Sequence, residues 1–384
     1  MTVPGFTSTG SKRPDALFGV SADVPGRMVR AAGCRLWDDR GAEYLDTAMA
    51  LGAVALGYGH PAVVEAVERA ARDGVVGSLA PALEAEVAER LCAVIRGAEA
   101  VRFLKTGAEA VAAAVRLARV VTGRERVLTC GYHGWLDWCA EEAGVPKAVR
   151  GLRREVAFDD PAALTATLEA FQPVAAVVLE PVVSAPPSEE WLATASREAR
   201  RHGALLVFDE IKTAFRVAAG GMAERSGVVP DLTVVGKALG NGLPIAAVCG
   251  AREVMEAATR TWISSTLATE YVSLAAARAV LETYAREPVL EHLERVGIRF
   301  YRVLEQLADA HPELVGGVRG LPQMCYLDFA TEALSCRVAR EAARRGLLFK
   351  RNAYNFVSLA HGDEEIEMVT ERLGDVMVEV ARTC

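Results

Sequence analysis

Two residues of opposite charge, Asp209 and Lys237, each follow a short apolar segment of the sequence. Asp209 comes directly after residues 205–208, and Lys237 comes one glycine after residues 232–235. An amine that is withdrawn from water becomes a nucleophile and can form an imine with an aldehyde. A carboxylate nearby can keep the nitrogen of a heterocycle protonated, and pyridoxal phosphate (PLP) chemistry needs both groups. Taken singly, Asp209 could equally cap a turn and Lys237 could be a solvated surface residue.

The segments that carry these residues belong to a longer alternation of strands and helices. Apolar strands are predicted at 101–104, 126–129, 174–179, 204–208, 232–235 and 245–248, with helices at 108–121 and 190–201. Strands that are apolar throughout and separated by helices are typical of a mostly parallel sheet covered on both faces. Ligands of such sheets bind beyond the carboxyl ends of the strands, where Asp209 and Lys237 lie.

The sequence changes character on either side of this alternation. A predicted helix at 274–285 is followed by helix, strands, helix, strand and helix, and the opening stretch to about Ala16 is polar and rich in Gly and Pro. We expect residues 55–285 to form a large PLP-binding domain. Residues 1–54 and 286–384 should form a small domain together, with the opening stretch loosely held.

Composition and charge narrow the classes of function. The net charge of -7 argues against a nucleic-acid partner, which usually needs a basic face. No apolar run reaches the length of a membrane helix, and the first residues lack the apolar stretch of a signal peptide. The eight cysteines contain no C-x-x-C pair, so neither a zinc site nor a redox dithiol is indicated. We therefore expect a cytoplasmic protein without metal, nucleic-acid or membrane partners.

The segments around Asp209 and Lys237 resemble the signature of class III aminotransferases. Residues 208–216 read Phe-Asp-Glu-Ile-Lys-Thr-Ala-Phe-Arg, and residues 230–244 read Pro-Asp-Leu-Thr-Val-Val-Gly-Lys-Ala-Leu-Gly-Asn-Gly-Leu-Pro. The resemblance implies fold type I of the PLP-dependent transferases, an α/β fold. Its large domain has a mostly parallel seven-stranded sheet, and its small α/β domain combines both ends of the chain. PLP as cofactor and a homodimer with shared active sites are also implied.

Within that family the chain is most similar to the branch of glutamate-1-semialdehyde aminomutase. This similarity rests on Phe215-Arg216-Val217 and on the pair Gly220-Gly221. It extends from about Gly26 to the C-terminus, so it covers nearly the whole chain.

The resemblance assigns roles to single residues. Lys237 would hold PLP as a Schiff base and then move the proton between the substrate carbon and the cofactor, while Asp209 would keep the ring nitrogen positive. Tyr132 matches the aromatic residue that stacks on the ring, and Ile211 would pack on the other ring face. Thr266 matches the threonine that reaches the phosphate in the partner subunit.

Gly107 and Ala108 open a predicted helix after a strand, and backbone N–H groups at a helix start favour an anion such as the PLP phosphate. The predicted catalytic residues are Lys237 and Asp209. The predicted cofactor-binding residues are Gly107, Ala108, Tyr132, His133, Glu180, Asp209, Ile211, Lys237 and Thr266.

The sequence departs from its relatives at positions that bind substrate. Glutamate- and ornithine-type members carry a gate glutamate after a Glu-Pro pair, whereas Glu180-Pro181 is followed here by about Ala185 at that position. The late stretch 355–361 lacks the arginine that binds their donor carboxylate. The N-terminal substrate-binding arginine of the aminomutase aligns near Ala16, and its glutamate before the late stretch aligns with Ala353.

Further substitutions point the same way. Met49, Ala50 and Leu51 stand where the aminomutase has polar and aromatic pocket residues, which leaves a less polar wall. Arg27 or Arg30 could take over the role of the missing arginine. Arg351 and Lys212 are cations without an assigned role, and each could meet an anionic substrate or be structural.

These departures predict an aminotransferase that moves an amino group from an amino donor to a carbonyl-containing small molecule. The alternative is an intramolecular PLP enzyme, a 2,1-aminomutase of the glutamate-1-semialdehyde type or a racemase, which would use the same residues. A third reading is a binding or scaffolding member without activity, and the presence of both Asp209 and Lys237 argues against it.

Overall fold

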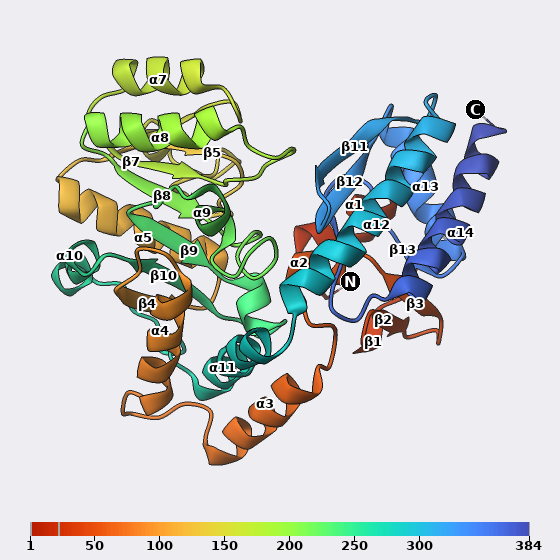
Figure 1. The fold of residues 1–384 in the computed structure, drawn as a ribbon, viewed down its shortest axis with the longest axis horizontal. Coiled ribbons are helices and arrows are strands. Elements are labelled where there is room, and N and C mark those ends of the chain that lie inside the picture. Colours follow the sequence, from red (N-terminus) through yellow and green to blue (C-terminus); the bar gives the residue numbers. More distant parts are fainter. Residues whose placement is uncertain (1, 22–23, 384) are drawn as a thin grey trace. The chain divides into compact units, whose positions relative to one another are not determined.

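The chain folds into two units, which Figure 1 shows in the computed structural model. The structure describes residues 2–21 and 24–383, so Cys384 lies outside it. One unit comprises the described residues of Met1–His60 and Glu291–Cys384, and the other comprises Pro61–Leu290. The domain boundaries expected from the sequence, after residues 54 and 285, lie a few residues before these. No helix within the described ranges is long and apolar enough to cross a membrane.

A seven-stranded sheet organises the unit Pro61–Leu290. Its order is β4-β10-β9-β8-β7-β5-β6. The strands are β4 (Ala100–Leu104), β5 (Arg126–Cys130), β6 (Arg153–Glu155), β7 (Val174–Leu179), β8 (Leu205–Asp209), β9 (Leu232–Val235) and β10 (Ala246–Gly250). Only β10 runs antiparallel to its neighbours among these strands. The predicted fold class is therefore confirmed, and the carboxyl ends of β4, β5, β7, β8 and β9 meet at one edge.

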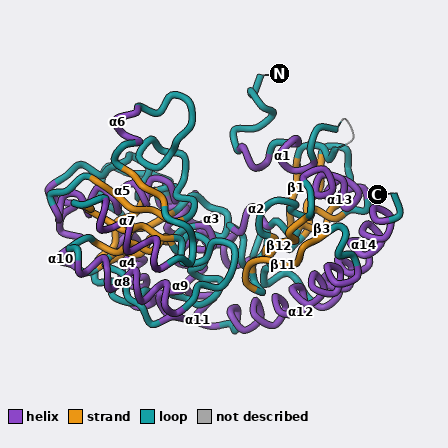
Figure 2. The backbone as a smooth tube through the Cα atoms, turned by 90° about the horizontal axis from the view of Figure 1, so that it is seen from above, coloured by secondary structure: helices purple, strands orange, loops and turns teal. Residues whose placement is uncertain are grey.

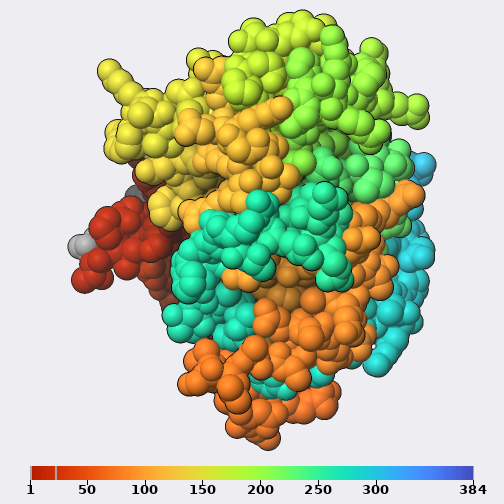
Figure 3. Space-filling view, turned by 90° about the vertical axis from the view of Figure 1, so that its left-hand side faces the viewer, coloured from red at the N-terminus to blue at the C-terminus, as the bar shows by residue number. Residues whose placement is uncertain are grey.

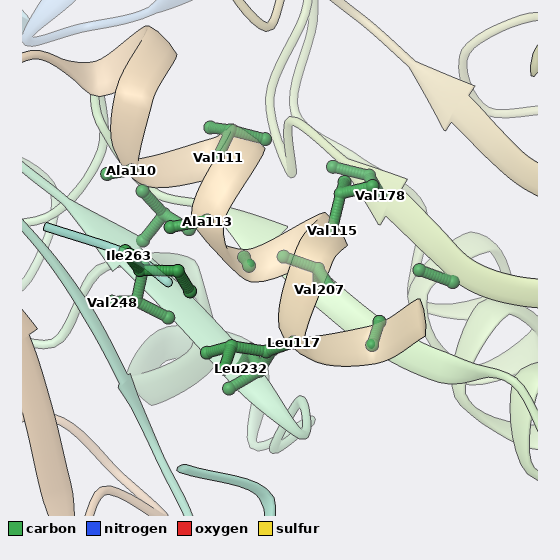
Figure 4. Packing of buried hydrophobic residues seen from close by; sticks show 14 of the residues in the cluster. Ala110, Val111, Ala113, Val115, Leu117, Val178, Val207, Leu232, Val248 and Ile263 are labelled. Carbon is green, nitrogen blue, oxygen red and sulfur yellow. The ribbon is translucent and has the colours of Figure 1, made fainter. Parts of the chain in front are cut away.

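Helices bury both faces of this sheet, as the continuous apolar strands predicted. The helices are α3 (Pro61–Asp73), α4 (Ala82–Val94), α5 (Gly107–Thr122), α6 (Lys147–Arg150), α7 (Pro161–Ala170), α8 (Glu189–Arg201), α9 (Gly221–Ser226), α10 (Arg252–Met255) and α11 (Tyr271–Arg286), with 3₁₀ turns at Lys237–Gly240 and Glu256–Arg260. Alternate residues of each strand face opposite sides. Val207 packs on α5 with Val178 and Leu232 (Figure 4), whereas Phe208 packs with Trp191 of α8 on the other face.

The other unit contains two smaller sheets. One has the order β1-β2-β3-β13 and the other β11-β12-β14. The strands are β1 (Met28–Ala32), β2 (Arg35–Asp38), β3 (Glu43–Asp46), β11 (Val315–Leu321), β12 (Met324–Phe329), β13 (Leu347–Leu348) and β14 (Asn355–Phe356). The helices are α1 (Pro14–Phe18), α2 (Met49–Gly52), α12 (Val289–Ala310), α13 (Glu332–Arg344) and α14 (Asp363–Ala381), after a 3₁₀ turn at Gly10–Lys12. In Figure 2, α12, α13 and α14 flank the strands of this unit.

The N-terminal segment is held more firmly than its composition predicted. Arg351, which is buried, donates from Nε to the carbonyl oxygen of Ala16 at 3.1 Å and from Nη1 to Ser335 Oγ at 3.1 Å. Lys350, also buried, donates to the carbonyl oxygen of Ser11 at 3.1 Å. The expectation of a loosely held opening stretch was wrong, because two buried cations bind its backbone carbonyls.

Helix α2 is a left-handed turn. The φ angles of Met49, Ala50, Leu51 and Gly52 are 42°, 49°, 60° and 81°. A left-handed conformation costs an L-residue roughly 1–2 kcal/mol, and three of these four residues carry a side chain. Strain of this kind persists only where the surrounding structure fixes the backbone.

A buried carboxyl, that of Glu210, anchors the loop that leaves β8. It accepts the backbone N–H of Met222 at 2.9 Å and that of Ala223 at 2.8 Å, both at the start of α9. The hydroxyl of Thr213 also donates to it. Burial raises the pKa of Glu210 to about 7, although these three donors oppose the rise. Since Asp209 is the neighbouring residue, Glu210 also fixes the end of β8.

We predict that the Glu210 carboxyl makes folding stability fall as pH rises. Its pKa is above the ordinary value of 4.5 in the folded state, so the folded protein binds an extra proton between about pH 4.5 and 7. The stability that this proton contributes is lost as the pH passes through 7. The free energy of unfolding of the wild type, minus that of Glu210→Gln, should therefore decrease between pH 5 and 8 in chemical denaturation. Glu224→Gln, at an exposed carboxyl on α9, is the control, and a constant difference for Glu210→Gln would refute the prediction.

Candidate active site

The carboxyl edge of the large sheet collects the residues that the sequence singled out. Asp209 is the last residue of β8, and Glu180 directly follows β7. Lys237 begins the 3₁₀ turn after β9, and His133 lies in the loop after β5. Because these strands are parallel, their following residues lie on one side of the sheet.

Asp209 is buried and paired with a histidine. Its Oδ2 lies 2.8 Å from His133 Nδ1, and its Oδ1 accepts the backbone N–H of Ile211 at 3.3 Å. Only 4% of the Asp209 surface is exposed. Asp209 is two residues after Val207, so it points to the face of the sheet that α5 covers.

The loop that carries His133 has little freedom to move. Gly131 and Gly134 on either side have φ angles of 98° and 103°. A Cβ atom at Gly131 would lie 2.6 Å from Glu180 Oε2, and one at Gly134 would lie 2.5 Å from the Cβ of Ala108. The loop is therefore packed against both β7 and the start of α5.

Glu180 links two segments of the site through its carboxylate. One oxygen accepts the backbone N–H of Tyr132 at 2.9 Å, and the other lies 2.9 Å from Lys212 Nζ. Glu180 is buried and Lys212 is mostly so. Lys212, which had no assigned role, is thus part of an ion pair, whose strength is increased by its removal from water.

Lys237 has an unusual backbone and an altered amine. Its φ angle is 44°, in the left-handed region that non-glycine residues rarely adopt. Burial is the main cause that lowers the pKa of Lys237 to about 8. The neighbouring cation Lys212 lowers it further, while Glu180 and Asp209 act in the opposite direction. A larger fraction of the amine is therefore unprotonated near neutral pH than for an exposed lysine.

The start of α5 is shaped for an anion. Thr106 caps the helix, with its hydroxyl accepting the N–H of Glu109 at 3.2 Å in a capping box. Gly107 and Ala108 occupy the first helical positions, where N–H groups have no partner within the helix. A Cβ atom at Gly107 would lie 3.1 Å from Ile211 Cδ1, and one at Gly236 would lie 2.8 Å from the same atom. Ile211 thus lies against both the helix start and the residue before Lys237.

Two residues of the predicted set stand apart from these contacts. Tyr132 is 71% exposed, although its backbone is fixed by Glu180. Thr266 is exposed and lies in the loop between residues 261 and 270. The structure of one chain therefore brings together seven of the nine predicted residues and leaves these two side chains at the surface.

Sequence reasoning missed the partners of the predicted residues. The pairing of His133 with Asp209 and the Glu180–Lys212 pair had no signal in spacing, because each joins segments far apart in the chain. Trp138 stacks on His133 from within the same loop, which has no regular spacing to predict the contact. The sequence feature that could have indicated a role for Lys212 is its position next to Ile211 and three residues after Asp209.

The residues of this edge fit PLP. An amine with a lowered pKa, a buried carboxylate and an anion-binding helix start match the aldehyde, the ring nitrogen and the phosphate of the cofactor in turn. The glycines at 107 and 236 let Ile211 lie close against the backbone of the helix start and of the residue before Lys237, where a Cβ atom would collide with it.

Comparisons with known proteins agree with this geometry. The family model for aminotransferase class-III matches residues 20–377. A glutamate-1-semialdehyde 2,1-aminomutase of Thermomicrobium roseum is 34% identical, over 98% of this chain and 96% of that protein. A solved PLP form of the FumI protein of Sphingopyxis sp. has a TM-score of 0.88 at 26% identity, and covers 97% of this chain and 94% of its own.

A β-phenylalanine aminotransferase of Variovorax paradoxus is similar too. It has a TM-score of 0.87 at 25% identity, with 98% of this chain and 91% of that chain covered. The match extends over nearly the whole length, and both the fold and the residues at the sheet edge fit the same cofactor. The chain belongs to the class III aminotransferases, a family of PLP-dependent enzymes with fold type I.

Proposed function

We propose that this chain is an aminotransferase that moves an amino group from a donor to a small carbonyl compound, with Lys237 and Asp209 as its catalytic residues. The convergence of the Lys237 amine, whose pKa is lowered, and the buried carboxylate of Asp209 at one sheet edge supports amino-group chemistry on PLP. The observation that carries the choice of transamination is that the candidate substrate-binding arginines already have partners. Bound PLP supplies an aldehyde that binds amines and a ring that withdraws electrons from the substrate carbon.

Each residue of the site has a separate task in this proposal. Lys237 holds the cofactor and then carries a proton to and from the substrate carbon, which a group with a pKa near 8 does efficiently close to neutral pH. Asp209 holds the positive charge of the ring nitrogen. The N–H groups of Gly107 and Ala108 bind the phosphate, and Ile211 covers one ring face.

The contacts of the positively charged residues in and around the N-terminal segment favour transfer of the amino group between two molecules over transfer within one. A fixed carboxylate usually needs a paired cation, and the aminomutase supplies one where this chain has Ala16. Arg351 donates to the Ala16 carbonyl, and Lys212 pairs with Glu180 at 2.9 Å. Arg27 donates to the carbonyl of Phe6. Arg30 lies over the ring of Trp37. Each replacement candidate thus already has a partner, which disfavours a substrate of the glutamate-semialdehyde type.

Intramolecular transfer is the second candidate, and the comparisons favour it more directly. Curated relatives that match over 92–98% of the chain carry the name glutamate-1-semialdehyde 2,1-aminomutase, at 31–34% identity. An aminomutase would use Lys237 and Asp209 in the same way, so the geometry of the sheet edge supports both candidates equally.

We predict that Lys237→Ala abolishes turnover and that Asp209→Asn lowers kcat by ~10²-fold or more. The first variant lacks the amine, and the second replaces a charge by a neutral amide that cannot balance the ring nitrogen. Borohydride reduction of the wild type with PLP should fix the cofactor to Lys237, which peptide mass mapping would detect. Near-normal rates in either variant, or attachment at Lys212, would disprove the assignment.

Glutamate-1-semialdehyde separates the two candidate functions. We expect inefficient isomerisation without an added donor, with kcat/KM well below the ~10⁴ M⁻¹s⁻¹ of ordinary enzymes. Amino transfer from a donor to a carbonyl acceptor should instead depend on both compounds. Efficient isomerisation in the absence of a donor would reject transamination and establish the aminomutase function.

The rate of PLP uptake by the apoprotein should rise with pH and level off above about pH 8. Only the unprotonated Lys237 amine can react, and its pKa is lowered to about 8. Lys212→Met removes a neighbouring positive charge, so the plateau should move to higher pH. Stopped-flow absorbance measures both profiles, and a pH-independent rate would contradict the prediction.

We further propose a homodimer with shared active sites, in which Thr266 contacts the phosphate of the PLP bound in the partner subunit. Apolar side chains at the surface support it: Leu79 is 87% exposed and Trp262 is 80% exposed. The backbone of Tyr271 donates to Val75 at 2.7 Å, so the segments that follow α3 and precede α11 lie side by side (Figure 3). Light scattering at micromolar concentration should give twice the chain mass. A fully active monomer would exclude the proposal.

A further inference from the structure

A mostly buried ion pair joins the end of β4 to the start of α11, although the two are far apart in the sequence. Lys105 directly follows β4, and Glu270 directly precedes α11. The Nζ of Lys105 lies 2.7 Å from Oε1 of Glu270, and the two side chains are only 13% and 10% exposed. Removal from water strengthens the attraction between opposite charges, so this pair fastens the two segments to each other.

Further contacts hold each partner of the pair. The backbone N–H of Lys105 donates to Glu109 Oε2 at 3.2 Å, and Glu109 belongs to the capping box of α5. Glu270 caps α11, because its carboxylate accepts the N–H of Val272 at 2.7 Å and that of Ser273 at 2.9 Å. Burial acts to raise the pKa of Glu270, but hydrogen bonds from Lys105 and Ser273 hold that pKa below its ordinary value. The ion pair therefore connects two capped helix starts.

The loop that ends at this ion pair carries Thr266, and two arginines hold its other end. Arg116 of α5 donates from Nη1 to the carbonyl oxygen of Trp262 at 2.7 Å. Arg102 of β4 donates from Nη2 to the carbonyl oxygen of Ile263. Both ends of the loop are thus fastened to β4, to the residue after it or to α5, which are the elements that form the predicted phosphate site.

We propose that Lys105 and Glu270 are positioning residues, whose ion pair holds the loop in the place from which Thr266 reaches the phosphate of the PLP bound in the partner subunit. The phosphate site of each subunit and the loop that it offers to its partner then behave as one rigid body. This inference rests on the proposed function, in which the protein is a homodimer and Thr266 contacts that phosphate.

Substitutions at Lys105 test this role. Lys105→Met removes the positive charge, whereas Lys105→Arg keeps it. Arg90→Met is the matched control, because Arg90 of α4 pairs with Glu282 at 3.2 Å and so fastens α11 further along the helix. We expect Lys105→Met to shift the ³¹P signal of bound PLP and to raise the dissociation constant of PLP by ~10-fold, the effect of one lost hydrogen bond to a charged group. Lys105→Arg and Arg90→Met should leave both values near those of the wild type.

Hydrogen exchange of the apoprotein gives a readout that needs no cofactor. The N–H groups of Ala268 and Glu270 are hydrogen-bonded within the loop and can report its opening. Peptides from residues 261–270 should exchange faster in Lys105→Met and in Glu270→Asn, since both variants lack the ion pair. Asparagine is a good N-cap residue, so Glu270→Asn keeps the cap of α11. Unchanged exchange in both variants, or an equal increase in Arg90→Met, would overturn the proposal.

Thr266→Val separates failure of this inference from failure of the proposed dimer site. It should weaken PLP binding and shift the ³¹P signal, and adding Lys105→Met should then change little more, because the contact that Lys105 positions is already lost. If Thr266→Val leaves both measurements unchanged, Thr266 does not reach the phosphate, and the two proposals fail together. If Thr266→Val changes them while Lys105→Met does not, or if the two effects simply add, only the positioning by Lys105 is rejected.

Discussion

The site depends on one constraint, the burial of both faces of a parallel sheet. Strands β7, β8 and β9 are almost entirely apolar on both sides, so their charged groups appear only where the strands end. Because these strands are parallel, the ends coincide, and Asp209, Glu180 and Lys237 gather at one edge. Buried helix and sheet contacts on either side then hold that edge rigid, as the site of a reaction with strict geometry requires.

The charges at this edge balance one another. The carboxylate of Glu180 pairs with the amine of Lys212, and the carboxylate of Asp209 contacts His133. Both carboxylates also raise the pKa of Lys237, which burial and Lys212 lower. Burying each charge alone would be costly, and opposite charges nearby reduce that cost. Lys212 has a double effect, since it neutralises Glu180 and also makes the Lys237 amine easier to deprotonate.

Sequence patterns predicted the strands of the large sheet better than the side-chain contacts between distant segments. Apolar runs predicted the strands β4, β5 and β7 to β10 with shifts of at most two residues, because burial on both faces leaves a strong signal. The edge strand β6, Arg153–Glu155, was missed because its residues are charged. The pairing of His133 with Asp209 joins residues 76 positions apart, and no local pattern encodes such a contact. The prediction of a loosely held N-terminal segment failed for a similar reason. The polar composition of that segment does not reveal that Arg351, from a distant part of the chain, binds its backbone. No sequence pattern predicted the left-handed turn α2 either, because Met, Ala and Leu normally favour a right-handed helix.

The turn α2 limits which substitutions residues 49–51 tolerate. A left-handed backbone is least accessible to β-branched side chains, and Met49 is fully buried, so a substitution there must keep both an unbranched side chain and the volume that fills the core. The surrounding fold, rather than the three side chains, must supply the energy that keeps the turn closed. Ala50 and Leu51 are only partly buried, so an exchange at either position disturbs less packing than one at Met49 and leaves the path of the chain to its surroundings.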